Sequence, residues 1–221
     1  MVNVVSRVKN SQPDNEFSPQ AFVVLQNISW PTYQALLADM GEHRAARLTY
    51  CCGTLEIKMP SKLHELINRL LERIIATLTE ELGLDIVPLG STRFDAEESE
   101  QGVEPDSCFY IQHANCVEPD DIAPPQDIPP DLVVEVDITS SSKSRLLVYQ
   151  MMGVPEVWRY NRQEIKILLL TQGEYVECSS SPTFPMLSAK TLWRFLELGK
   201  QSKNHNQIIA ELRAWIRKQA G

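Results

Sequence analysis

The chain has 221 residues, of which 43% are hydrophobic and 23% are charged, with a formal net charge of −8 at pH 7. This length and composition are ordinary for a globular protein with a substantial core. The acidic balance disfavours a protein that coats nucleic acid non-specifically, because neutralising phosphates requires clustered Lys and Arg, but it leaves room for an enzyme that touches DNA through one local patch.

Membrane and disulfide classes are also disfavoured by the sequence. No apolar run approaches the roughly 20 residues that a bilayer span needs, and the polar start lacks the apolar centre of a signal peptide. We therefore expect no membrane contact and a cytoplasmic location. The five cysteines have no C-x-x-C spacing, so neither a disulfide framework nor a zinc site is indicated.

The N-terminal part of the chain predicts an arm, a short helix, a hairpin and one long helix. Residues 1–28 contain Ser, Gln, Pro and Asn with little periodicity, which predicts a flexible arm that ends in the short apolar segment Phe22-Val23-Val24-Leu25. Between residues 61 and 82 the apolar residues recur at three- and four-residue steps, with Ser61 as a plausible N-cap and Gly83 as a terminator, the pattern of a long amphipathic helix. The other elements expected here are a helix at 31–40 and strands at 47–50, 54–59, 86–88 and 92–94.

The remaining pattern predicts an α/β domain. A strand at 108–111 precedes a Pro- and Asp-rich loop at 113–130, whose length is unusual unless the loop is functional or mobile. We treat residues 29–200 as one domain, with a C-terminal helix in 201–221 that packs on it or extends it. The later elements expected are strands at 132–138, 156–160, 165–170 and 175–178, and helices at 143–152, 189–198 and 204–219.

The strand at 132–138 is apolar except for two carboxylates. Such a run is typical of a strand that is covered on both faces, yet Glu135 and Asp137 interrupt it. Residues two apart on a strand point to the same face, so these carboxylates should project side by side. Two like charges on a buried surface are costly unless something neutralises them, and a divalent metal commonly does so.

A third carboxylate stands at the entrance of another predicted strand. Asp106 directly precedes the apolar run at 108–111, and if the two strands are neighbours it can converge with Glu135 and Asp137 on one hard cation. Mg²⁺, or Mn²⁺ in its place, prefers such oxygen ligands. The ion would activate a water molecule and stabilise the charge that develops on a scissile phosphate.

Several motifs resemble, in order and spacing, the Uma-type family of restriction-endonuclease-like proteins. They are Gly102-Val103-Glu104-Pro105-Asp106, then Pro130-Asp131-Leu132-Val133-Val134-Glu135-Val136, then Gly153-Val154-Pro155-Glu156-Val157-Trp158. The resemblance runs from roughly residue 30 to 190. It implies a PD-(D/E)xK nuclease-like fold, with a central mixed β-sheet flanked by helices, and Mg²⁺-dependent hydrolysis of DNA. It also implies that Asp106 and Glu135 are the metal-binding acids, and by analogy that a homodimer is possible.

The chain departs from this pattern at the lysine. The general nuclease pattern has a lysine two residues after the second acid, where this chain has Asp137. The resembling family has a lysine on the next helix, four residues before a tyrosine, and here that slot holds Arg145, one helical turn before Tyr149. Arginine stabilises charge but stays protonated, so it cannot be a general base. The nearby lysine, Lys143, lies two residues from the slot.

Simpler interpretations remain open for these residues. Pro-Asp before a strand is a common turn, so Asp106 alone is a weak signal. His64, in the first turn of the long helix, either faces the site or is a boundary histidine. The sequence thus favours a Mg²⁺-dependent endonuclease, in which Asp106 and Glu135 hold the metal, Asp137 assists, and Arg145 or Lys143 supplies positive charge. The alternative is a catalytically impaired nuclease-fold protein that binds nucleic acid or a protein partner.

Overall fold

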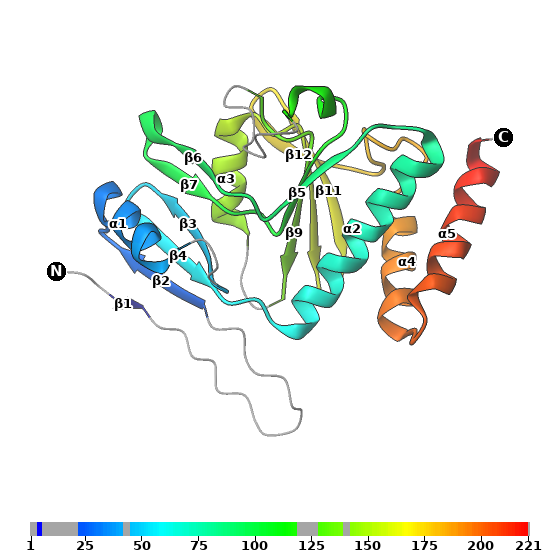
Figure 1. Ribbon diagram of the computed structural model, residues 1–221, viewed down its shortest axis with the longest axis horizontal. Coiled ribbons are helices and arrows are strands. Elements are labelled where there is room, and N and C mark those ends of the chain that lie inside the picture. The colour runs from blue at the N-terminus through cyan, green and yellow to red at the C-terminus, as the bar shows by residue number, and fades with distance from the viewer. Residues whose placement is uncertain (1–3, 6–21, 42–44, 119–127, 139–141, 221) are drawn as a thin grey trace, which may run out of the picture.

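The computed structural model of the protein describes residues 4–5, 22–41, 45–118, 128–138 and 142–220. Within these residues the chain forms two six-stranded sheets and five α-helices (Figure 1). None of the helices in this part of the chain is long and apolar enough to cross a bilayer. The predicted mixed sheet flanked by helices is confirmed, and a second, antiparallel sheet adjoins it.

The first sheet is antiparallel and has the strand order β1-β2-β4-β3-β7-β6. Its strands are β1 (Val4–Val5), β2 (Phe22–Gln26), β3 (Arg47–Cys51), β4 (Thr54–Lys58), β6 (Phe94–Ala96) and β7 (Gln101–Val103). Helix α1 (Trp30–Met40) begins at the N-cap Ser29, whose hydroxyl accepts from the Thr32 amide, and packs its buried Trp30 and Tyr33 on this sheet. Tyr33 crosses β7 so closely that a Cβ on Gly102 would lie 2.2 Å from its hydroxyl oxygen and 2.6 Å from Asp95 Oδ1, so any side chain at this position would have to displace them.

The second sheet is mixed and has the strand order β12-β11-β10-β9-β8-β5. Its strands are β5 (Val87–Gly90), β8 (Ser107–Tyr110), β9 (Leu132–Asp137), β10 (Glu156–Asn161), β11 (Ile165–Thr171) and β12 (Glu174–Cys178). Strand β9 pairs in parallel with β10 and antiparallel with β8. All six residues of β9 are buried, as the apolar run predicted.

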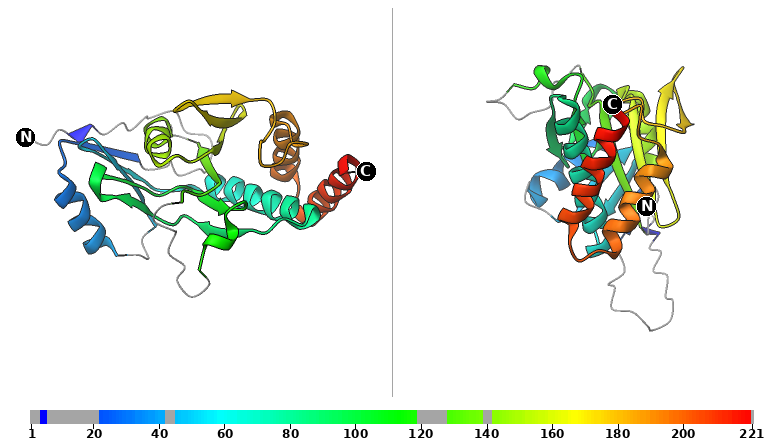
Figure 2. Two further views of the ribbon diagram at one scale, coloured as in Figure 1. Left: turned by 90° about the horizontal axis from the view of Figure 1, so that it is seen from above. Right: turned by 90° about the vertical axis from the view of Figure 1, so that its right-hand side faces the viewer.

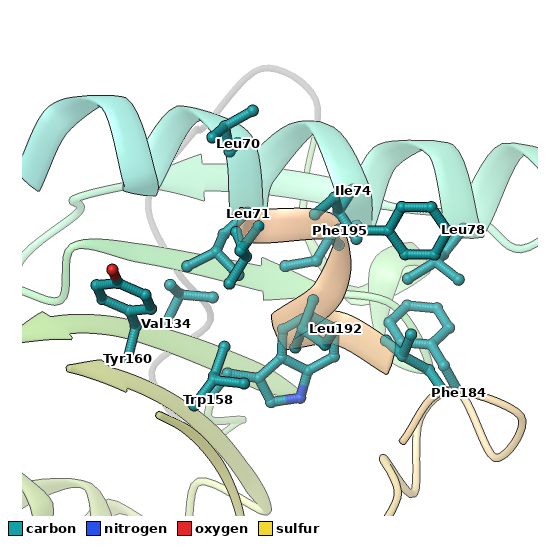
Figure 3. Packing of buried hydrophobic residues seen from close by; sticks show 14 of the residues in the cluster. Leu70, Leu71, Ile74, Leu78, Val134, Trp158, Tyr160, Phe184, Leu192 and Phe195 are labelled. Atoms are coloured by element: carbon teal, nitrogen blue, oxygen red, sulfur yellow. The ribbon is translucent and has the colours of Figure 1, made fainter. Parts of the chain in front are cut away.

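Helices cover both faces of the second sheet. Three of them, α2 (Lys62–Leu82), α4 (Ala189–Gln201) and α5 (His205–Ala220), contact one another and pack on one face (Figure 2). Figure 3 shows the core beneath them, where Leu71 and Leu78 of α2 and Phe195 of α4 lie over the sheet residues Val134 and Trp158. Helix α3 (Lys143–Met152) packs on the opposite face through Val148 and Tyr149. Alternate residues of β9 therefore face α2 and α3.

Most expected elements occur within a few residues of their predicted bounds, and three strands differ. Strands β1 and β2 lie inside the range predicted as a flexible arm, but they pair with each other, and β2 pairs along its whole length with β4. Strand β7 was not predicted, because Gln101–Val103 is short and contains a glycine. Residues 1–3 and 6–21 of the predicted arm lie outside the described residues, as do 119–127 of the long loop and 139–141 of the Ser-rich turn.

Candidate active site

The candidate site lies at the junction of the two sheets. Residues 104–106 carry the chain from β7 in the first sheet to β8 in the second, and Asp106 ends this crossing. Ser107 pairs with Val134 across the antiparallel β8–β9 ladder, so the preceding Asp106 and the following Glu135 are brought next to each other. The register thus places the two predicted acids together on adjacent strands.

Asp106 is surrounded by donors and positive charge. Its Oδ2 accepts from the Val136 amide at 2.8 Å and from Lys58 Nζ at 3.0 Å. His64 Nε2 lies 2.9 Å from the same oxygen, and Arg47 Nε lies 3.5 Å from Oδ1; both are close electrostatic contacts without hydrogen-bond alignment. Burial acts to raise the pKa of Asp106, but Lys58, His64 and Arg145 together lower it well below its usual range. Asp106 is therefore ionised throughout the physiological range.

A polar network on α2 holds the backbone at Asp106. The Asn68 side-chain amide donates to the Asp106 carbonyl at 3.2 Å and to the Ser107 hydroxyl at 3.0 Å. The Ser107 hydroxyl in turn bonds Glu72 at 2.5 Å. Because Asn68 and Ser107 are buried, this network fixes how the crossing segment meets the helix.

Glu135 is fully buried and faces α3. Its Oε1 accepts from the Tyr149 hydroxyl, and its Oε2 lies 2.7 Å from an Arg145 guanidinium nitrogen, although that oxygen has no aligned hydrogen-bond donor among the described residues. Burial raises the pKa of Glu135 to about 7, since Arg145 and Lys58 offset the burial only in part and the neighbouring Asp106 adds repulsion. Burial and Glu135 also raise the pKa of Tyr149 well above its ordinary value.

Asp137 points to the same face as Glu135 but has different partners. Its Oδ2 accepts from the amide and the hydroxyl of Ser142, each at 3.0 Å, and lies 2.7 Å from Arg159 Nε. Its Oδ1 accepts from Arg145 at 3.4 Å. Asp137 therefore ties the end of β9 to the start of α3 and shares Arg145 with Glu135.

The other predicted cations are placed differently from one another. Arg145 is buried between Glu135 and Asp137, and the negative charges of Glu135 and Asp106 outweigh its burial and raise its pKa further above its ordinary value. Lys143 is exposed in the first turn of α3. His64, predicted to be either a site or a boundary residue, is buried against Asp106.

Three cationic residues of the site were not predicted. Lys58 and Arg47 come from β4 and β3 of the first sheet, where they stand opposite each other, and Arg159 comes from β10. The available signal was Lys58 itself, a charged residue directly after the strand residue Ile57. It could not be assigned to the site because its partners lie 48 and 78 residues further along the chain.

The donor chemistry of the site fits a hard cation held by two carboxylates. Asp106 and Glu135 supply carboxylate oxygens, the Val136 carbonyl oxygen points to the same place, and Glu135 Oε2 is a buried oxygen without an aligned donor. Among the described residues, no three His, Cys, Asp or Glu side chains lie close enough to hold a metal, so Asp137 does not complete a three-carboxylate cluster. Two carboxylates are sufficient for Mg²⁺, which takes its remaining ligands from water and phosphate.

Comparisons with known proteins give the family and the fold of the chain. Residues 30–201 match the family described as "Uma2: Putative restriction endonuclease". One similar solved structure is that of a putative nuclease of the DUF820 group from Anabaena variabilis, which is 19% identical, with a TM-score of 0.54 over 76% of this chain and 99% of that chain. This likeness shows the shared fold. A search of curated proteins gives no match.

Proposed function

The chain belongs to the Uma2 family of putative restriction endonucleases, and we propose on that premise that it hydrolyses phosphodiester bonds in DNA with Mg²⁺ held by Asp106 and Glu135. The observation that carries the proposal is the pair of adjacent buried carboxylates at the sheet junction, ringed by cationic side chains from both sheets. Burying a charge is costly unless the charge is paired or binds a metal ion. Buried ionisable groups with shifted pKa values are found at functional sites more often than elsewhere.

Asp106, Glu135 and Arg145 would each have a different role in this reaction. Asp106 is ionised at physiological pH, as a cation ligand must be, while the raised pKa of Glu135 lets it exchange a proton near neutral pH. When bound, Mg²⁺ supplies Lewis acidity and lowers the pKa of a coordinated water. Arg145 is a permanent positive charge beside Glu135, suited to stabilise charge on the phosphate and unable to act as a base.

The exposed fractions of the basic side chains indicate where a phosphate group would reach the site. Asp106 and Glu135 are buried, whereas the side chains of Arg47 and Arg159 are 21% and 18% exposed. These two arginines are therefore the positive groups that a phosphate would meet first, and each already contacts a carboxylate of the site. Guanidinium groups match phosphate geometry well, so we expect DNA to enter on this side.

A plasmid-cleavage assay with Mg²⁺ or Mn²⁺ tests the proposal. The wild-type protein should nick or linearise the plasmid, and Asp106→Ala and Glu135→Ala should each lose at least roughly 100-fold of the rate, since losing a residue that merely orients a metal ligand costs 10–100-fold. Asp85→Asn, on an exposed residue remote in sequence from the site, is the matched control. Cleavage that is indifferent to both site substitutions would remove the nuclease proposal for this site.

A second candidate function is binding without cleavage. Binding without cleavage is favoured because the two acids that would hold the metal already have basic partners. Asp106 is contacted by Lys58 and Arg47, Glu135 is contacted by Arg145, and both acids are buried. A protein of this kind would bind labelled DNA, measured by fluorescence anisotropy, with an affinity that falls for Arg47→Gln and Arg159→Gln but shows no turnover. Binding that neither substitution weakens would count against DNA as its ligand at this site.

A further inference from the structure

The Lys58 ammonium contacts three oxygen atoms of the candidate site, which we call the oxygen cluster: the two carboxylate oxygens of Asp106 and the carbonyl oxygen of Val136. The ammonium nitrogen lies 3.0 and 3.4 Å from the two oxygens of Asp106 and 3.1 Å from the carbonyl oxygen of Val136. An ammonium has three N–H donors, so these three oxygens satisfy it. Lysine is almost never fully buried unless it is paired, and Lys58 is only 2% exposed. The oxygen cluster therefore surrounds the Lys58 ammonium much as the ligands of a metal ion surround the ion.

The same oxygens are those that a hard divalent cation would use. Carboxylate and carbonyl oxygens are the ligands of Mg²⁺ and Mn²⁺, and Asp106 with Val136 presents both kinds at one point. An ammonium and a metal ion cannot share that point, because two cations a few ångströms apart repel strongly in a buried, low-dielectric site. Binding of one excludes the other.

The local charge already favours the internal cation. Three carboxylates of the site, Asp106, Glu135 and Asp137, are contacted by four Lys and Arg side chains, Arg47, Lys58, Arg145 and Arg159, which leaves one positive charge in excess (4 − 3 = 1) when all seven are ionised and His64 is neutral. A metal that entered beside all of them would add two further positive charges. Release of one basic group is the direct way to admit it.

Lys58 is the group best placed to leave. It is the last residue of β4, and the next residue, Met59, is exposed. Its charge lies at the end of a flexible four-carbon stem, whereas Arg145 is buried in α3 between two carboxylates. Withdrawal of Lys58 would still leave Asp106 bonded to the Val136 amide and close to His64.

We propose that Lys58 is a built-in cation that competes with divalent metal for Asp106 and Val136, so that metal binds only after the Lys58 ammonium withdraws. This proposal rests on the metal site named in the proposed function and adds a regulatory element to it. If the withdrawn form is a minor state, the apparent metal affinity falls by its fractional population. Removing the ammonium should therefore tighten metal binding.

Calorimetric titration with Mn²⁺ in the absence of DNA tests this on the full chain. Lys58→Met keeps a long side chain without charge and should bind Mn²⁺ at least roughly tenfold tighter than wild type. Lys166→Met, the same change at a lysine that pairs with Glu177 on the edge of the second sheet, should match wild type. The double variant Lys58→Met/Asp106→Asn should lose the gain. Binding by Lys58→Met that equals wild type or is weaker would overturn the proposal.

A labelling experiment on the wild-type protein keeps the test independent of whether Lys58→Met folds. Acetic anhydride acetylates accessible lysines, and mass spectrometry reports the extent at each one. Mn²⁺ should increase acetylation of Lys58 several-fold and leave Lys166 unchanged; protection of Lys58 that no concentration of Mn²⁺ alters contradicts the proposal. Neither measurement uses cleavage, so a protein that binds metal in this way but cuts no DNA would retain the inference and lose the proposed reaction.

Discussion

Asp106 and Glu135 are equally buried carboxylates on neighbouring strands, yet their pKa values shift in opposite directions. Asp106 accepts hydrogen bonds from Lys58 and a backbone amide and has two further basic side chains nearby. Glu135 has Tyr149, a neutral donor, and one guanidinium that is not aligned for a hydrogen bond. Burial alone therefore does not decide ionisation; the number and charge of the donors around each acid does.

The difference follows from where the donors come from. The Asp106 carboxylate is contacted by Arg47 and Lys58 from the first sheet, while the side chains that contact the Glu135 carboxylate, Tyr149 and Arg145, both come from α3. The first sheet thus supplies Lys58, the strongest of the charges that lower the pKa of Asp106, and His64 of α2 and Arg145 of α3 add to its effect. Substitutions in the two regions should consequently have different effects on stability and on its dependence on pH.

The largest expected effect is at Asp106. Asp106→Asn leaves Lys58 buried beside a neutral partner, and breaking a buried ion pair in this way should lower the free energy of unfolding by about 3–5 kcal/mol. Urea denaturation at pH 7 measures the change, with the exposed Asp85→Asn as a control near zero. A loss no greater than that of the control would mean that Lys58 does not depend on Asp106.

The substitution Glu135→Gln should behave differently and vary with pH. The folded-state pKa of Glu135 is raised from 4.5 to about 7, so between these values the folded chain keeps a proton that the unfolded chain has lost, and wild-type stability falls as pH rises through this window. Glutamine does not titrate. Its stability relative to wild type should therefore increase from pH 4.5 to pH 7, by on the order of 3 kcal/mol, since one pKa unit corresponds to about 1.4 kcal/mol.

Denaturant unfolding of both proteins at several pH values checks this sign. The relative stability of Glu135→Gln should be flat below pH 4.5 and above pH 7, and should rise only between them. A difference that is constant over the whole range would show that Glu135 titrates normally in the folded state.

A smaller loss is expected where the first sheet meets the crossing segment. Gly102→Ala would place a Cβ 2.2 Å from the Tyr33 hydroxyl oxygen and 2.8 Å from Tyr33 Cζ, so the tyrosine must move, at a cost of typically 1–3 kcal/mol for overpacking. Thermal unfolding measures the loss. Adding Tyr33→Phe removes the nearest atom and should recover part of it; an additive second loss would show that this contact is not the cause.

The smallest effect is expected at Glu81, a half-buried carboxylate on α2 outside the candidate site, which serves as a reference for the two acids of the site. Hydrogen bonds from Arg217 and Arg213 on α5 lower the pKa of Glu81 on α2 to about 2. Because this folded-state pKa is depressed, its stabilisation is present above the ordinary value of 4.5 and is lost as pH falls toward 2. Glu81→Gln should lower the urea midpoint slightly at pH 7 and not at all near pH 2, and a shift as large as that of Asp106→Asn would contradict this ranking.

The sequence predicts those parts of the fold and site whose signal is local. The three- and four-residue spacing of Leu and Ile specifies α2, and an apolar run broken by Glu135 indicates a buried strand with an unusual acid. Strand parity correctly places Glu135 and Asp137 on one face. Asp106 follows from its position at the start of a strand, and the register of β8 with β9 then brings it beside Glu135.

What the sequence does not predict depends on contacts between distant segments. Lys58 and Asp106 meet only because β4 of the first sheet ends beside the start of β8 in the second, and Arg159 reaches Asp137 through the parallel pairing of β10 with β9. The partners of Asp137 likewise depend on how the chain returns at Ser142. The apolar segment at 22–25 was noted but was not predicted to be a strand, because its pairing partner β4 lies about 30 residues further along the chain and gives no local signal.

The most direct test of the central claim, that the donors around each acid set its ionisation, is a ¹³C NMR titration of the side-chain carboxyls, with Asp106→Asn and Glu135→Gln used to assign the two signals. Glu135 should titrate with a midpoint near 7, and Asp106 should stay ionised to the lowest pH at which the protein remains folded. Midpoints for both acids near their ordinary values, or a higher midpoint for Asp106 than for Glu135, would contradict it.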